Sequence, residues 1–342
     1  MKIPAIHKIK TIGLLLFTFF AGINASYSQD STYVDALDFF ETNKVQWVNQ
    51  IPPLQQDIKK QRKGWFKRLL LGNDYIIGLQ KPVLAIPVNT ASSIILDQSQ
   101  GTLFKYEEDK LKIPKIVRKQ DDRFTSLVSA CLLPNKDLLF TDSKLEGVFK
   151  LTEDLKSIGL LNDGLQLKQP TGIAYSSINN QIWVVETGAH QISILDSQGN
   201  RIKTIGNRGS DKGEFNFPTY IWIDNKGTAY VVDALNYRIQ LFDSAGKFLS
   251  MFGENGNGTG YFASPKGVAT DSYGNIYVVD ALFHYVQIFD KKGNYLYNFG
   301  KQGRGTGEFW MPSGIFIDAN NFIYVADSYN SRIQIFKLNY ER

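Results

Sequence analysis

A glycine-rich stretch recurs at a fixed period in the C-terminal half of the chain. The three copies, which follow one another at intervals of 47 residues, are GNRGSDKGEFNFPTY (206–220), GENGNGTGYFASPKG (253–267) and GKQGRGTGEFWMPSG (300–314). Each alone resembles a phosphate-binding loop, but such a loop needs a helix N-terminus after it, and here a strand-like run follows. The repetition instead indicates a repeat architecture, in which the glycines supply positive φ in a connecting loop.

Each period also contains four short β-rich runs. In one unit they are GVATD (267–271), IYVVD (276–280), VQIFD (286–290) and YLYNFG (295–300). The third and fourth runs are joined by a D-x-x-G turn, which is typical of a tight hairpin with glycine in the left-handed conformation. Four strands per period, joined by hairpins, predict the blade of a β-propeller.

An acidic residue that closes the second run of each unit counts the blades. Successive acids are separated by 45, 44, 47, 47 and 47 residues, and the first two units are the most degenerate. A proline lies 15 residues before four of these acids and 16 before Glu186. We therefore predict an all-β fold, a six-bladed propeller of four-stranded antiparallel blades. The six acids, which we expect to be structural, are Asp97, Asp142, Glu186, Asp233, Asp280 and Asp327.

The last unit ends after its third strand, at IQIFKLNYER. Because a ring of blades leaves no edge open, we expect a segment within 44–72 to supply the missing strand. Two stretches are candidates, VQWVNQI (45–51) and GWFKRLLLG (64–72), and residues 29–43 are either a short helix or a loose tail.

The N-terminus has the pattern of a secretory signal peptide. A basic region with Lys2, Lys8 and Lys10 precedes a 13-residue apolar run, 11–23, which is too short to span a bilayer comfortably. Cleavage after Ala25 or after Ser28 fits the small residues that follow; the alternative is an uncleaved anchor. We expect a signal peptide over 1–28, an N-terminal segment over 29–75 that contains the closing strand, and the propeller over 76–342.

Charge and cysteine content exclude several classes of protein. The net charge of +5 falls to 35 basic against 33 acidic residues once the three lysines of the signal are removed. Six of the remaining basic residues lie in the segment 59–68, so no basic face is left for a nucleic acid. Cys131 is the only cysteine, which excludes a disulfide within the chain and, because it lies far from the cleavage region, disfavours a lipoprotein.

The repeats resemble those of the NHL-repeat family of β-propellers, and the chain is similar to exported bacterial propellers of that type. The resemblance is carried by P-x-G-[IV]-x-x-D, G-x-[IA]-Y-V-x-D and N-x-R-I-Q-[IL]-F, strongest over 165–338 and weaker over 80–164. The positions that give the family its name are Asn236-Tyr237-Arg238 and Asn330-Ser331-Arg332. The histidine of the pattern is kept only as His190 and His284.

Arginine follows the repeat acid by five residues in two units, as Asp233 with Arg238 and Asp327 with Arg332. The pair is either a strut that ties the loop between the second and third strands or part of a polar ligand ring. Because it recurs with the fold, we favour the strut. Units three and five carry Gln191 and Tyr285 in the arginine position, so their loops are where a site could have been built.

The resemblance also implies activities that can be weighed against the residues. Some NHL propellers are lyases that hold zinc in the central channel through histidines, and that chemistry needs about three nitrogen ligands. Only His190 and His284 remain after removal of the signal, so a three-histidine site cannot form. We predict no cofactor. A calcium or zinc ion held by carboxylates in the channel stays open, and nothing singles out a nucleophilic serine.

Aromatic residues gather in the segments between strands. Their register places Phe283, His284, Tyr285, Tyr237, Tyr329 and Trp310 in loops, which on one face would form an amphipathic rim suited to peptides, glycans or proteins. The alternative is that they cover the joints between blades. The candidate binding residues are His190, Tyr237, Arg238, Phe283, His284, Tyr285, Trp310, Tyr329 and Arg332.

These observations favour a non-enzymatic role. We expect an exported, monomeric binding or scaffold module of the periplasm, outer envelope or medium, whose partner is a protein, a peptide or a glycan. A metal-dependent hydrolase or lyase with its site in the channel is the alternative, and a purely architectural role in an envelope assembly is a third possibility.

Overall fold

The computed structural model describes residues 45–53, 78–118 and 124–339. The predicted signal peptide, the segment 29–43, the basic run 59–68 and the stretch 64–72 lie outside the described residues. No helix in the described ranges is long and apolar enough to cross a membrane.

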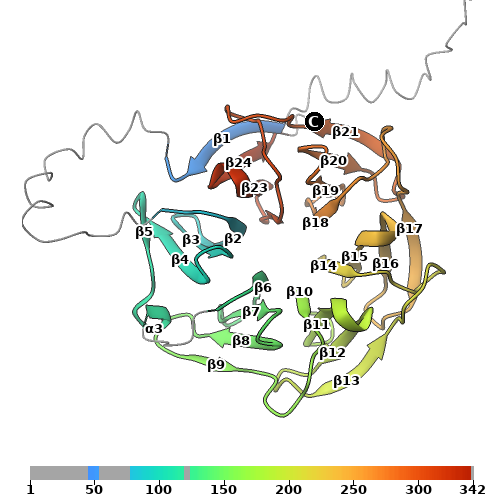
Figure 1. Ribbon diagram of the computed structural model, residues 1–342, viewed down its shortest axis with the longest axis horizontal. Coiled ribbons are helices and arrows are strands. Elements are labelled where there is room, and N and C mark those ends of the chain that lie inside the picture. Colours follow the sequence, from blue (N-terminus) through green and yellow to red (C-terminus); the bar gives the residue numbers. More distant parts are fainter. Residues whose placement is uncertain (1–44, 54–77, 119–123, 340–342) are drawn as a thin grey trace, which may run out of the picture.

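Six four-stranded antiparallel sheets stand around a central axis as the blades of a ring (Figure 1). Strand order within each sheet follows chain order from the axis outward, except in the last sheet, whose outermost strand comes from the N-terminal side. The predicted six-bladed β-propeller is therefore confirmed. We number the blades 1 to 6 along the chain.

The strands of the first three blades are given from the axis outward. Blade 1 consists of β2 (Pro82–Asn89), β3 (Ser92–Asp97), β4 (Thr102–Glu107) and β5 (Lys110–Lys112). Blade 2 consists of β6 (Leu127–Leu132), β7 (Leu138–Asp142), β8 (Gly147–Leu151) and β9 (Ile158–Leu160). Blade 3 consists of β10 (Pro170–Ser176), β11 (Gln181–Glu186), β12 (Gln191–Leu195) and β13 (Arg201–Ile205).

The last three blades contain the clearest repeats. Blade 4 consists of β14 (Pro218–Ile223), β15 (Ala229–Asp233), β16 (Arg238–Phe242) and β17 (Phe248–Phe252). Blade 5 consists of β18 (Pro265–Thr270), β19 (Ile276–Asp280), β20 (Tyr285–Phe289) and β21 (Tyr295–Phe299). Blade 6 consists of β22 (Ile315–Ile317), β23 (Phe322–Asp327), β24 (Arg332–Leu338) and β1 (Val45–Ile51). Short helices complete the described chain: α3 (Lys115–Arg118), η2 (Thr187–Ala189), η3 (Ala234–Asn236) and η4 (Ser328–Asn330).

The strand β1 closes the ring. It pairs antiparallel with β24, from Val45 opposite Leu338 to Ile51 opposite Ile333. Of the two predicted candidates, VQWVNQI therefore supplies the outer strand of blade 6. A side-chain contact adds to the backbone ladder, because Nη1 of Arg332 donates to Oε1 of Gln50 at 3.1 Å.

The proline–acid spacing has a simple structural cause. Pro218 begins β14 and Asp233 ends β15, and the two are cross-strand partners, as are Pro265 and Asp280 in blade 5. The register shifts immediately after the proline in both pairs, which indicates a β-bulge. Proline suits this position because a bulge at a strand end needs no ladder donor.

The recurrent glycine-rich stretches are the loops between blades. Each loop folds over a phenylalanine that is fully buried: Phe215, Phe262 and Phe309. The first glycine of each loop has positive φ, and a Cβ there would lie 2.3–2.5 Å from the ring of that phenylalanine. Glycine is required because the backbone both turns through the left-handed region and rests on an aromatic ring.

The hydrophobic core lies between adjacent blades. Separate clusters fill the joints between blades 3 and 4, 5 and 6, 6 and 1, and 2 and 3. A larger cluster contains side chains of blades 1, 2, 4 and 5, and so extends across the centre of the ring.

Two faces of the ring follow from this topology. The loop face carries the connections between blades and between the second and third strands of each blade. The turn face carries the hairpin turns that join the first strand to the second and the third to the fourth.

Candidate functional site

The repeat acids are buried under the loop face. All six are at most 1% exposed, and each receives a backbone N–H from the segment that leads into the first strand of its own blade. The shortest of these bonds, at 2.7 Å, reach Asp97, Asp233 and Asp327. A carboxylate that accepts several such bonds holds the loop to the blade, which is a structural task.

The two arginine–aspartate pairs are buried ion pairs. Nε of Arg238 lies 2.8 Å from Asp233, and Nε of Arg332 lies 2.7 Å from Asp327. The remaining guanidinium nitrogens of Arg238 donate to the carbonyls of Ser210, Asp211 and Glu214 in the glycine-rich loop. These arginines, both candidate binding residues by sequence, therefore direct their donors into the fold and not toward solvent.

The asparagine and glutamine of N-x-R-I-Q clamp the same loop. Nδ2 of Asn236 bridges Asp233 and the carbonyl of Gly209, and Asn330 repeats this with Asp327 and Gly303. Gln240 completes the clamp, accepting from the Gly213 N–H and donating to the Glu214 carbonyl. The motif thus fastens the glycine-rich loop to its blade.

The two histidines join neighbouring blades. Nδ1 of His190 accepts the Phe217 N–H at 3.1 Å, and Nδ1 of His284 accepts the Met311 N–H at 3.1 Å. Both histidines have left-handed φ, which non-glycine residues adopt uncommonly, and so do the residues whose N–H they accept. His190 is buried and His284 is half-buried, on blades that are not adjacent. No group of three or more histidine, cysteine or acidic side chains is placed to hold a metal within the described residues.

Units without the arginine use other donors. Asp280 accepts the N–H groups of Ala263, Ser264, Leu282 and Phe283. Glu186 accepts from Gln191 and Ser193 and forms an ion pair with Arg201 of β13 at 2.9 Å.

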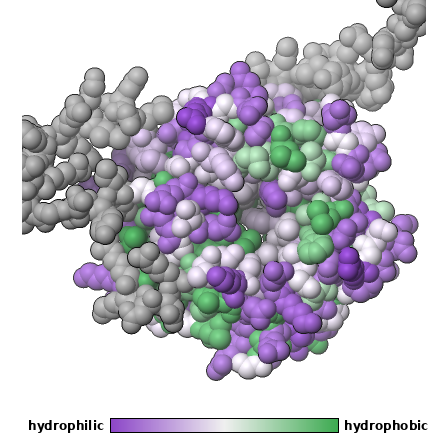
Figure 2. Space-filling model, in the orientation of Figure 1, coloured by the Kyte–Doolittle hydropathy of each residue, from purple (hydrophilic) through white to green (hydrophobic). Residues whose placement is uncertain are grey.

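Exposed apolar side chains stand on the loop face of three consecutive blades. Leu235, Leu282 and Tyr329 are 50%, 55% and 57% exposed, and they occupy the same repeat position, two residues after the acid. Phe217 adds a partly exposed ring beside them. We call Leu235, Leu282, Tyr329 and Phe217 the apolar arc. Figure 2 shows apolar patches over blades 4 and 5 beside the central hollow.

The other candidate residues support the apolar arc. Tyr237, Phe283, Tyr285 and Trp310 are half-buried. The rings of Phe283 and Tyr285 stack at 5.2 Å, and Arg304 lies over Trp310 at 4.6 Å from the ring centroid. One prediction was wrong in detail, because Tyr285 is the first residue of β20 and not a loop residue: it pairs with Asp280 across the ladder.

Sequence reasoning missed Leu235, Leu282 and Phe217. For the two leucines the available signal was an apolar residue two positions after the repeat acid, in a segment too short to bury it.

A tyrosine crosses the central channel. Tyr220 of β14 is buried, and its hydroxyl donates to the carbonyl of Ile315 in β22, on the inner strand of blade 6, at 3.0 Å. Burial raises the pKa of Tyr220. Blades 3, 5 and 6 carry glycine at this position, and a Cβ at Gly172 would lie 2.7 Å from the Ile221 nitrogen. The inner strands of blades 3 and 4 therefore approach each other closely, and the Tyr220 side chain reaches from blade 4 to blade 6.

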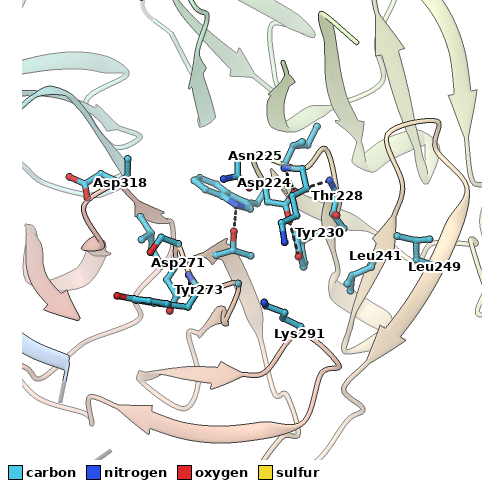
Figure 3. A pocket seen from close by; sticks show the side chains of 18 of the residues that line it. Asp224, Asn225, Thr228, Tyr230, Leu241, Leu249, Asp271, Tyr273, Lys291 and Asp318 are labelled. Atoms are coloured by element: carbon cyan, nitrogen blue, oxygen red, sulfur yellow. Dashed lines mark hydrogen bonds between the residues drawn. The ribbon is translucent and has the colours of Figure 1, made fainter. Parts of the chain in front are cut away.

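A polar cavity of about 580 Å³ opens on the turn face (Figure 3). It extends from the channel mouth outward between blades 4 and 5, and blade 6 contributes its first hairpin turn. No candidate binding residue from the sequence lies in it. We call this cavity the turn-face groove.

Comparisons with known proteins agree on the fold. A family model described as a 6-bladed β-propeller matches residues 270–341, and no curated protein matches the sequence. Among similar solved structures is a catalytically inactive virginiamycin B lyase from Staphylococcus aureus with quinupristin, at a TM-score of 0.56 and 13% identity, covering 78% of this chain and 98% of that one.

Two further similar structures are auxiliary nutrient binding proteins. The one from Bacteroides thetaiotaomicron aligns with a TM-score of 0.59 and 16% identity over 76% of this chain and 69% of that chain. The one from Bacteroides ovatus aligns with a TM-score of 0.60 and 13% identity over 77% and 70%. At such identities the likeness shows the fold alone, because one propeller architecture serves many functions.

Proposed function

We propose that this chain is an exported, NHL-type propeller that acts as a binding module and docks a protein or peptide partner on its loop face. The apolar arc is the observation that carries the proposal. Three large side chains at one repeat position, on three consecutive blades, are each at least half exposed. Apolar side chains scattered singly need no explanation, but a set gathered on one face is typical of a contact surface.

Charged groups beside the arc fit the same role. Lys81 lies over the Tyr329 ring at 5.8 Å, and Arg304 covers Trp310. Interfaces of this kind are enriched in aromatic side chains and arginine at their centre. The names of two of the similar solved structures, auxiliary nutrient binding proteins, are in keeping with a binding role.

The alternative of a channel enzyme receives less support. Tyr220 reaches from blade 4 to the inner strand of blade 6, and the described residues contain no group of three or more side chains placed as metal ligands. The two histidines already accept backbone N–H groups through Nδ1.

Site-specific photo-cross-linking in the native host tests the proposal. A benzoylphenylalanine at Leu282 is expected to form a discrete adduct with one partner, and the same residue at Gln198, exposed on the turn face of blade 3 and outside the turn-face groove, is expected to form none. For the partner so identified, Leu282→Ser should weaken binding about tenfold or more, the loss expected of an interface hot spot. Leu145→Ser is the matched control, an exposed leucine in the equivalent loop of blade 2, outside the arc.

Equal adduct patterns at both positions, or equal affinities for Leu282→Ser and Leu145→Ser, would contradict docking through the arc.

A further inference from the structure

The turn-face groove is bounded by equivalent turns of three blades. Asp224, Asp271 and Asp318 begin these turns in blades 4, 5 and 6, and all three line the groove (Figure 3). Oδ1 of each aspartate accepts two backbone N–H groups of its own turn at 2.8–2.9 Å. The turns that form the walls of the groove are therefore tied by hydrogen bonds to their first residue.

The second carboxylate oxygen differs among the three turns. In Asp224 and Asp271 it accepts the hydroxyls of Tyr230 and Tyr277, at 3.2 and 3.1 Å. Within the described chain, Oδ2 of Asp318 has no hydrogen-bond partner. Asp318 is half-buried at the channel end of the groove, so it presents an open acceptor there.

Donors face the groove from the opposite side. The Lys226 and Lys291 ammonium groups and the Asn225 amide line it, and none has a hydrogen-bond or ion-pair partner among the described residues. Three carboxylates against two ammonium groups leave the lining close to neutral. Such a lining favours a ligand that both donates and accepts hydrogen bonds over a strongly charged anion or cation.

Aromatic and aliphatic surfaces complete the groove. The Trp222 ring is half-buried and held by two contacts: its Nε1 donates to Oγ1 of Thr270 at 2.9 Å, and its ring meets Phe316 edge-on at 5.4 Å. Tyr273 stands exposed at the lip, and Leu241 and Leu249 line the outer end. The groove reaches from β14 to β17, four strands at about 4.8 Å spacing, so it has the shape for an extended ligand.

We propose that the turn-face groove binds a short, uncharged saccharide. Fixed aromatic faces accept the C–H surface of a sugar ring, while Asp318, Asn225 and Lys291 offer the mixture of acceptors and donors that hydroxyl groups need. The volume lies within the range of small-molecule sites, roughly 300–1,000 Å³. The groove opens on the turn face, whereas the apolar arc stands on the loop face, so the two sites lie on opposite faces of the ring. The proposal is thus independent of the partner that the loop face docks.

Calorimetric titration of the full chain tests the proposal, with maltose, cellobiose, xylobiose, mannobiose and chitobiose as probes, supported by a glycan array. At least one probe is expected to bind with a Kd below about 1 mM. Asp318→Asn, which keeps the acceptor that the turn uses, and Lys291→Ala should each weaken binding about tenfold. Asp196→Asn is the matched control: Asp196 holds the same kind of turn in blade 3 and lies outside the groove.

Absence of binding to every probe and on the array would overturn the proposal. So would saccharide binding that Asp318→Asn and Lys291→Ala leave unchanged, or binding of short peptides in place of saccharides. Leu282→Ser should leave saccharide affinity unchanged, so failure here and failure of loop-face docking are told apart.

Discussion

Blades 4 and 6 bury their repeat acid beside an arginine, whereas blade 5, between them, buries the same acid without one. Asp233 and Asp327 each receive one N–H from the segment leading into their blade, together with arginine, asparagine and glutamine side chains. Asp280 receives two such N–H groups and two more from its own loop. The fold can therefore stabilise a buried carboxylate either with a hydrogen-bonded arginine or with additional backbone N–H groups, which in Asp280 act beside an electrostatic contribution from Lys266.

The histidines account for this difference. His190 precedes blade 4 and His284 precedes blade 6, and each takes the N–H of the residue before the next proline. In blade 5 the corresponding N–H, from Ser264, returns to Asp280. An acid that loses one backbone donor to a histidine thus has an arginine instead, and the histidine and arginine positions form a unit that spans two blades.

Removing the arginine should produce the largest effect. Arg238→Met leaves Asp233 buried without its cation, and we expect a loss of about 3–5 kcal/mol in the free energy of unfolding. Tyr285→Met, the same position in blade 5, should cost no more than about 1.5 kcal/mol, because Asp280 is held by backbone donors. Urea unfolding of both variants measures the difference, and equal losses would show that the arginine does not neutralise the acid.

The recurrence of these features explains how much could be predicted from the sequence. The proline and the repeat acid are cross-strand partners, so their spacing carried both the strand register and the blade count. The sequence left two candidates for the closing strand. The alternation in VQWVNQI fits a strand, but only its pairing with β24 in the folded chain selects it.

The sites were less accessible to sequence reasoning. The sequence shows that Tyr220 takes the position of Gly172 and Gly267 in the repeat. It does not show that the Tyr220 hydroxyl reaches blade 6. Likewise, Asp224, Asp271 and Asp318 each end a β-rich run that can be recognised in the sequence. The groove, however, depends on how three blades are placed relative to one another. Exposure of Leu235 and Leu282 depends on loops too short to fold back over them.

Removing a histidine should have an intermediate effect. His284→Ala leaves the Met311 N–H without its acceptor, at a residue with positive φ, and we expect a loss of about 1–3 kcal/mol. Amide hydrogen exchange gives a direct readout, because the Met311 amide should exchange faster. In Tyr237→Ala, the equivalent change before blade 5, the Ser264 amide should stay protected by Asp280. Faster exchange at Ser264 would mean that the joint depends on side-chain bulk and not on the acceptor.

Asp271 is a buried acid of a third kind. It has no arginine partner, and it accepts two backbone N–H groups where Asp280 accepts four. Burial raises its pKa above the ordinary 3.8, although the Asn275 side chain and the Tyr277 hydroxyl oppose the shift. A raised pKa in the folded state means that its favourable contribution is present below 3.8 and is lost as the pH rises through the folded value. Relative to Asp271→Asn, the natural chain should therefore lose stability over a range of pH that begins near 3.8.

Urea unfolding of both chains across that range measures this smallest effect. Asp196 provides the opposite sign, because hydrogen bonds from the Asn200 side chain and backbone lower its pKa. Its contribution is present above the unfolded value and is lost as the pH falls, so the natural chain should gain stability relative to Asp196→Asn as the pH rises. If the stability difference between natural chain and variant had the same pH dependence at both positions, burial would not be the cause of the raised pKa of Asp271. The hydrogen bonds of the turn would then be enough to stabilise either carboxylate.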